Sequence, residues 1–249
     1  MEWSDDAIVL SVRPHGESGT ILEVLTRTHG RHLGLVRGGT SRKIKPVLQP
    51  GNGVRLLWRA RLSEHLGNFT AELDCARAGT LMDNREALTG LNAFAAMVGA
   101  TLPERAPYYD PVFAGANVLL DAMMEDGLAH WGALYVRWEA GLLDTLGFGL
   151  DLTQCAATGT TDDLAFVSPK SGRAVSGGAG APYAARLFAL PKFLVSSQNA
   201  DVSTADIVAG LTLTGHFLLE RVLKPNGKAM PAARLRLDAL AAHEQGESR

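Results

Sequence analysis

The sequence predicts an α+β protein of two domains, a small β-barrel over residues 1–80 and a helical domain over residues 81–249. In the first part, short β-branched or alternating apolar runs are separated by Gly and Pro turn signals, which is typical of a small barrel. Beyond residue 80, apolar residues recur every three or four positions, which is typical of amphipathic helices. Residues 151–191 are rich in Gly and Pro, so an irregular, turn-rich insertion is expected there.

Five strands are expected in the N-terminal domain. The first is a β-branched run that ends at Pro14, and the second alternates between two faces. His29-Gly30 is a hairpin-turn signal that leads into the third strand, and a long loop with several Gly and Pro residues precedes the fourth. The expected strands are residues 7–13, 20–26, 31–36, 54–59 and 69–73.

Four helices are expected in the C-terminal domain. Asp83 and Glu86 resemble a capping box at the start of the first helix. Asp110-Pro111 and Ser203 with Asp206 are start signals for later helices, and Gly or Pro follows each apolar stripe. The expected boundaries are Asp83 and Pro103 for the first helix, Asp110 and Gly127 for the second, Trp131 and Gly147 for the third, and Ser203 and Pro225 for the fourth.

Composition places the chain among globular proteins of a reducing compartment. Of its 249 residues 46% are hydrophobic, which is enough to bury a core, and the formal net charge is only −2. The two cysteines, Cys75 and Cys155, are expected to be free thiols. The chain begins with acidic residues and lacks the roughly 20-residue apolar run that spans a bilayer. We therefore expect a cytoplasmic protein that does not bind membranes.

The charges are distributed unevenly along the chain. Residues 1–80 carry 11 Lys or Arg and 8 Asp or Glu, whereas residues 81–249 carry 13 and 18. Between Val24 and Ser63 there is no acidic residue at all. The basic residues of that stretch are Arg27, Arg31, Arg37, Arg42, Lys43, Lys45, Arg55, Arg59 and Arg61.

This basic stretch predicts a nucleic-acid interface on the barrel. A surface of one charge sign concentrates polyanions, and the planar guanidinium of Arg suits phosphate oxygens. Arg55, Arg59 and Arg61 share one strand parity and should project from one face, while Trp58 on the other face is expected to be core. The alternative is an ordinary solvated surface. We interpret the nine basic residues as DNA-binding because no acid interrupts them.

No known catalytic motif is present. The histidines lack the spacing of a zinc protease, Gly227-Lys228 is not part of a Walker A loop, and no nucleophile elbow occurs. Gly177-Gly178-Ala179-Gly180 lacks the flanking strand and helix of a dinucleotide site. We therefore expect no catalytic residue, no enzymatic activity and no cofactor. A hydrolase or transferase with its site in the insertion is kept as an alternative.

Short motifs along nearly the whole chain together resemble one family. Each is weak alone, but their order and spacing resemble the RecO family of bacterial recombination mediators. The N-terminal motifs are Val9 to Pro14, Glu17-Ser18, Glu23 to Thr26, Gly30-Arg31, Arg37-Gly38 and Leu48 to Pro50. The C-terminal motifs are Arg137-Trp138-Glu139, Leu142-Leu143, Leu146 to Gly149, and Leu223-Lys224-Pro225 with Gly227-Lys228.

The resemblance implies an OB-fold barrel followed by a helical domain, and a role in DNA repair and recombination. It implies binding of single- and double-stranded DNA, annealing of complementary strands, and help in loading recombinase onto DNA coated with single-stranded-DNA-binding protein. RecR and the acidic C-terminal tail of the single-stranded-DNA-binding protein are the implied partners. Arg137 is the implied contact for that tail, and a location at the nucleoid follows from DNA binding. The alternative is a general OB-fold RNA-binding module.

The sequence departs from the family at a zinc site that many members carry in the insertion. Cys155 stands at the first ligand position, but Thr158 stands at the second, and residues 171–180 supply no cysteine pair. Because a structural zinc ion needs four ligands, we expect a degenerate site without metal. A second departure is Ala232-Ala233-Arg234, where the family often has a Ser-Arg pair.

Overall fold

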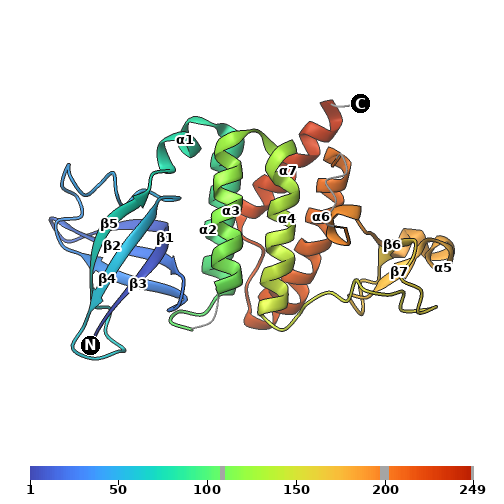
Figure 1. Ribbon diagram of the computed structural model, residues 1–249, viewed down its shortest axis with the longest axis horizontal. Coiled ribbons are helices and arrows are strands. Elements are labelled where there is room, and N and C mark those ends of the chain that lie inside the picture. The colour runs from blue at the N-terminus through green and yellow to red at the C-terminus, as the bar shows by residue number, and fades with distance from the viewer. Residues whose placement is uncertain (107–109, 197–201, 248–249) are drawn as a thin grey trace. The chain divides into compact units, whose positions relative to one another are not determined.

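A computed structural model describes residues 1–106, 110–196 and 202–247 of the chain (Figure 1). The chain divides into two compact units, Met1–Glu125 and Asp126–Arg249. Strands give way to helices near residue 80, yet three helices beyond that point belong to the same compact unit as the barrel. Among the described residues, no helix is long and apolar enough to cross a membrane.

The first unit begins with a closed five-stranded barrel in the order β1-β2-β3-β5-β4. Neighbouring strands are antiparallel except β3 and β5, which meet in parallel at Leu35 and Asn68. This α+β arrangement with an OB-like barrel confirms the predicted fold class. The strands are β1 (Glu2–His15), β2 (Gly19–Thr26), β3 (Arg31–Val36), β4 (Gly53–Arg59) and β5 (Asn68–Cys75).

Apolar side chains that alternate along the strands point to the inner face of the barrel and fill its interior. Trp58 is 2% exposed and lies among them, so its predicted place in the core is confirmed. Leu48 reaches this core from the β3–β4 loop. Gly34 is required on β3, because a Cβ there would lie 2.3 Å from the ring of Phe69.

Three helices complete the first unit: α1 (Ala78–Asp83), α2 (Arg85–Thr101) and α3 (Asp110–Glu125). The predicted cap at Asp83 is wrong by one residue, because Asn84 accepts hydrogen bonds from the backbone of Glu86 and Ala87. The short helix α1 was not predicted. Arg31 ties the barrel to the end of α2, since its Nε donates to the carbonyl oxygen of Leu102 at 2.9 Å.

In the second unit, α4 (Leu128–Thr145) and α7 (Ala232–Glu247) both pack on α6 (Thr204–Phe217), as Figure 1 shows. Ser203 and Asp206 form the predicted capping box of α6. The helix continues as a π-helical turn over Leu218–Leu223 and a 3₁₀ turn over Lys224–Asn226. Helix α7 was not predicted from the sequence, because it buries Arg234 together with few apolar side chains.

The insertion, residues 151–191, contains more secondary structure than its Gly- and Pro-rich sequence predicts. It contains a three-stranded sheet in the order β7-β6-β8, formed by Ala174–Ser176, Leu164–Val167 and Phe188–Ala189. The remaining elements are α5 (Gly177–Gly180) and 3₁₀ turns over Ala181–Arg186 and Lys192–Leu194. Cys155 is a buried free thiol, and its sulfur accepts a hydrogen bond from the Ser176 backbone at 3.2 Å. The described part of the chain brings no group of three or more metal-ligating side chains together.

Candidate nucleic-acid interface

No acidic residue interrupts the basic stretch in the sequence, but in the folded barrel acidic residues from other segments lie beside it. Strand β1 lies antiparallel to β4 and places Glu2 opposite Arg59 and Asp6 opposite Arg55. Arg59 donates to the two carboxylate oxygens of Glu2 at 2.6 and 3.2 Å, and this hydrogen bond lowers the pKa of Glu2. Arg55 lies 3.4 Å from the carboxylate of Asp6.

Two further cations of the stretch are paired with acids. Arg27 lies 2.8 Å from Asp110 at the start of α3, and Arg31 lies 2.5 Å from Glu23 on β2. The side chain of Arg31 is only 17% exposed, so it holds the barrel and α2 together rather than facing solvent. Four of the nine basic residues, although no acid interrupts them in the sequence, therefore face an acid in the folded barrel: Arg27, Arg31, Arg55 and Arg59.

The other five cations of the stretch are exposed, and none of them forms a salt bridge within the described residues. Arg61 lies in the β4–β5 loop. The rest lie between β3 and β4 on residues 37–45, which we call the basic loop. Its members are Arg37, Arg42, Lys43 and Lys45.

Hydrogen bonds and one buried side chain hold the basic loop in place. Thr40 bonds to the carbonyl oxygen of Ser18 in the β1–β2 turn, and Lys45 N bonds to the carbonyl oxygen of Ser41 at 2.9 Å. Leu48, just beyond the loop, is buried in the barrel. Arg37 Nε donates to Asn68 Oδ1 at 3.2 Å, which places this side chain at the start of β5. The loop therefore presents its cations to solvent from a fixed base.

The outer face of β2 and β3, a common oligonucleotide-binding face in OB-folds, is largely covered here. Leu25 is fully buried although it is not part of the barrel-interior cluster. Glu23 and Arg31 are each 17% exposed and pair with one another on this face. The end of α2 and the residues after it lie over Arg31, whose backbone accepts a hydrogen bond from Arg105 N at 2.7 Å. This face is therefore not open to an oligonucleotide.

A pocket of about 570 Å³ opens where β1 begins and β4 ends, and four of its lining side chains are aromatic rings: Trp3, His29, His32 and Trp58. The rings of Trp3 and His29 stack at 4.0 Å with planes 9° apart. His29 Nδ1 lies 2.9 Å from Asp5 Oδ2. This cluster was not predicted from the sequence, because its members come from three strands and a turn.

Two titratable groups at this pocket make the stability of the barrel depend on pH. Burial lowers the pKa of His32, which is 4% exposed, below 6.5, although its bond to Leu33 favours the charged ring. Burial raises the pKa of Asp5, but the hydrogen bonds from His29 and Thr28 outweigh it and hold that pKa below 3.8.

We expect the barrel to lose stability as the pH falls below 6.5. Below pH 6.5 the unfolded chain binds a proton at His32, whereas the folded barrel does not. The loss of stability therefore begins near the pKa of His32 in the unfolded chain and stops below its pKa in the folded barrel. Asp5 contributes stability above pH 3.8, which is lost as the pH falls through its lower folded pKa. Urea midpoints at pH 7.5 and 5 measure the first effect. His32→Phe should reduce the difference between the two urea midpoints, and the exposed control His65→Phe should retain it. Equal differences in both variants would contradict the role of His32.

In the second unit, Arg137 binds backbone rather than lying free. Its Nε and Nη2 donate to the carbonyl oxygen of Phe193 at 3.0 and 2.8 Å, and Nη2 also reaches the Ser196 carbonyl at 3.2 Å. The guanidinium carbon lies 5.9 Å from the centre of the Phe193 ring. Arg137 and Phe193 line a hollow of about 440 Å³ with Ala140 and residues 194–196.

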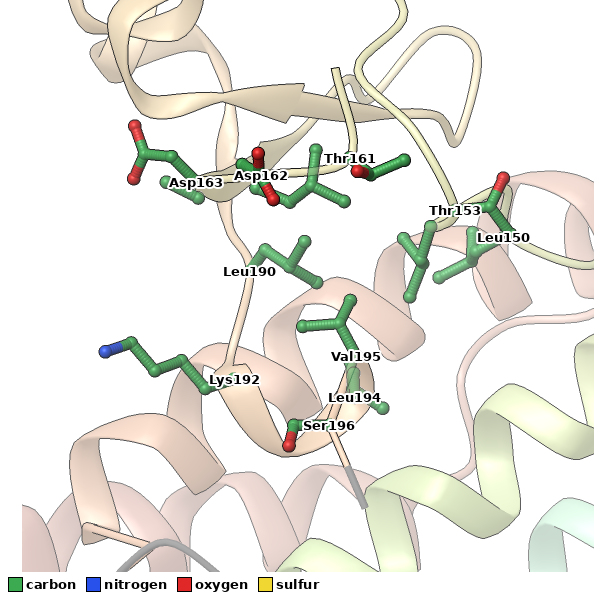
Figure 2. Close-up of a pocket in the computed structure, with 13 residues that line it drawn as sticks. Leu150, Thr153, Thr161, Asp162, Asp163, Leu190, Lys192, Leu194, Val195 and Ser196 are labelled. Atoms are coloured by element: carbon green, nitrogen blue, oxygen red, sulfur yellow. The ribbon is translucent and has the colours of Figure 1, made fainter. Parts of the chain in front are cut away.

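This hollow adjoins a larger groove of about 1020 Å³, and the two share Leu194, Val195 and Ser196. Figure 2 shows Leu190 and Val195 inside the groove, with Asp162 and Asp163 on one side and Lys192 on the other. The groove is therefore apolar at its centre and carries both signs of charge at its edges.

Comparison with known proteins identifies the family. The family model described as "Recombination protein O N terminal" matches residues 1–74, and "Recombination protein O C terminal" matches residues 82–230. DNA repair protein RecO from Cereibacter sphaeroides is 53% identical over 244 residues, which cover 97% of this chain and 99% of the relative. DNA repair protein RecO from Rhodospirillum rubrum is 49% identical over 239 residues, covering 95% and 94%. The chain thus belongs to the RecO family of DNA repair proteins.

Proposed function

We propose that the chain is a DNA-binding and strand-annealing recombination mediator that helps to load recombinase onto coated single-stranded DNA. It acts by binding rather than by catalysis, in the cytoplasm and at the nucleoid. The observation that carries the proposal is the basic loop with Arg61, five exposed cations without a salt bridge among the described residues. Cations on a fixed loop screen the phosphate repulsion that opposes the pairing of two strands.

The partner-binding part of the proposal concerns Arg137 and the hollow beside it. An acidic peptide tail needs a cation and an apolar surface to bind. Arg137 supplies the cation, and it lines the hollow together with Phe193, Leu194 and Val195. Two of its guanidinium nitrogens donate to carbonyl oxygens, while Nη1 has no hydrogen-bond partner within the described residues. We propose that Nη1 meets a carboxylate of the C-terminal tail of the single-stranded-DNA-binding protein. RecR is proposed as a partner on family membership alone.

Annealing of coated strands tests the proposal. Complementary oligonucleotides are precoated with the cognate single-stranded-DNA-binding protein, and duplex formation is followed by energy transfer between end labels. The full chain should accelerate annealing of both naked and coated strands. Arg137→Ala should retain annealing of naked strands and lose most of the acceleration on coated ones. No acceleration on either substrate would contradict the proposal, and a preference for matched RNA strands would favour an RNA-binding module.

A further inference from the structure

We propose that the pocket at the end of the barrel, lined by Trp3, His29 and His32, holds one unstacked nucleobase of a bound DNA single strand. This inference rests on the proposed DNA binding and adds a base-recognition site to it. At about 570 Å³ the pocket has the size of a small-molecule site and is larger than a single base. Its aromatic lining distinguishes it from the basic loop, whose exposed cations are suited to phosphates.

The pocket contains a ladder of nearly parallel rings. Trp3 stacks on His29 at 4.0 Å and also faces Trp58 at 5.6 Å with planes 18° apart. Trp58 is buried in the barrel, whereas the His29 side chain is 35% exposed. One end of the ladder is therefore anchored in the core and the other is open to solvent. A planar base can add to the open end, because every base has a π-face.

Polar groups around the ladder are fixed in orientation. The side chain of Asp5 is 6% exposed, and it holds His29 through the ring nitrogen and the backbone N–H of that histidine. His32 Nδ1 lies 2.8 Å from the carbonyl oxygen of Leu33, so that nitrogen carries the proton. Because burial keeps the His32 ring neutral, Nε2 is an acceptor, and it has no hydrogen-bond partner among the described residues. It is suited to receive an N–H from the edge of a base.

The surroundings of the pocket favour a nucleic-acid strand over a free aromatic molecule. Arg105 donates to the carbonyl oxygens of Ser63 and His65 at 2.6 and 3.0 Å and so fixes the β4–β5 loop beside the pocket. Arg61 lies in the same loop, two residues before Ser63. Stacking rings with an exposed cation close by are the two components of single-strand binding. With the outer face of β2 and β3 covered, this pocket offers a stacking surface at the end of the barrel.

Binding of base-bearing and abasic strands tests the inference. The full chain, Trp3→Ala and Trp3→Phe are titrated with a thymine oligonucleotide and with an abasic strand of equal length and charge. The wild type should bind the thymine strand about tenfold more tightly than the abasic strand. Trp3→Ala should lose that preference while its affinity for the abasic strand stays the same, and Trp3→Phe should retain most of it. Tyr183→Ala, an exposed aromatic side chain in the other unit, is the matched control and should behave as the wild type.

The outcomes separate the two proposals. Failure of the wild type to bind either strand overturns the proposed DNA binding itself. Equal binding of both strands by the wild type overturns only the base pocket. If Trp3→Ala loses affinity equally for the thymine strand and the abasic strand, the base pocket is also overturned. The defect would then concern charge or folding rather than contact with a base. Quenching of tryptophan fluorescence by the thymine strand, but not by the abasic strand, is the second expected result.

Discussion

Glu139→Ala is expected to lower the free energy of unfolding of the second unit by about 3–5 kcal/mol, because it leaves a buried guanidinium without its carboxylate. Glu139 and Arg234 are both 0% exposed and lie 2.6 Å apart between Arg234 Nε and Glu139 Oε1. Burial opposes the charge of Arg234, but the neighbouring Glu139 carboxylate more than compensates and raises the pKa of that arginine. The guanidinium of Arg234 therefore stays charged in its buried position.

Every remaining polar atom of the pair is also occupied. Arg234 Nη2 donates to Glu139 Oε2 at 2.9 Å and to the carbonyl oxygen of Leu211 at 3.0 Å, and Nη1 pairs with Asp238. Thr214 donates its hydroxyl to Glu139 Oε2 at 2.5 Å. This network joins α4, α6 and α7. Removing the carboxylate leaves several donors unsatisfied at once, which is why the expected loss exceeds that of an ordinary ion pair.

A double variant separates the cost of an unpaired charge from the value of the pair. Glu139→Met with Arg234→Met should recover most of the lost stability, because replacing a buried pair by apolar side chains is often neutral or better. Asp151→Ala, which breaks the half-exposed pair with Arg173, is the control and should cost less than about 1 kcal/mol. Urea unfolding followed through the buried Trp131 and Trp138 measures each effect. A loss below 1 kcal/mol in Glu139→Ala would contradict the assignment.

The two halves of this network could not be connected from the sequence, where one lies in a family-like motif and the other in a departure from the family pattern. Glu139 belongs to the Arg137-Trp138-Glu139 motif, and Arg234 lies 95 residues away in a helix that was not predicted. Helix α7 buries Leu237, Ala241 and a charged residue, so its apolar stripe is too thin to detect by periodicity. A buried arginine looks like a surface residue in a sequence.

The strands were predictable because local signals define them: β-branched or alternating apolar runs, and the Gly and Pro turn residues between them. The third expected strand, residues 31–36, coincides with β3, and the other four differ only at their ends. Local signals cannot give the pairing of strands that are distant in the chain. Glu2 lies opposite Arg59 because β1 pairs with β4 when the barrel closes, which brings together residues 57 positions apart. The charge pattern therefore identified the barrel as the basic domain but overestimated how many of its cations are unpaired.

Arg42→Gln, Lys43→Gln and Lys45→Gln together are expected to weaken single-strand binding about 100-fold at 0.1 M salt, since each phosphate contact contributes about 0.7 logarithmic units. The wild type, with about five neutralised phosphates, should show a log–log salt slope of about −3.5, and the variant a slope of about −1.4. The three side chains are exposed and form no salt bridge within the described residues, so the barrel should remain folded. Anisotropy titrations of a labelled oligonucleotide at several salt concentrations give both quantities.

The matched control removes the same net charge from the other unit. Lys170, Arg186 and Arg236 are exposed there, and changing all three to Gln alters the total charge of the chain by the same amount. If net charge alone governed binding, both triple variants would lose affinity and slope equally, and the basic loop would have no special role. If the loop contacts the phosphates, only the loop variant changes the slope, because counterions are released only where a cation meets the strand. A slope that stays near −3.5 in the loop variant would therefore place the interface elsewhere on the chain.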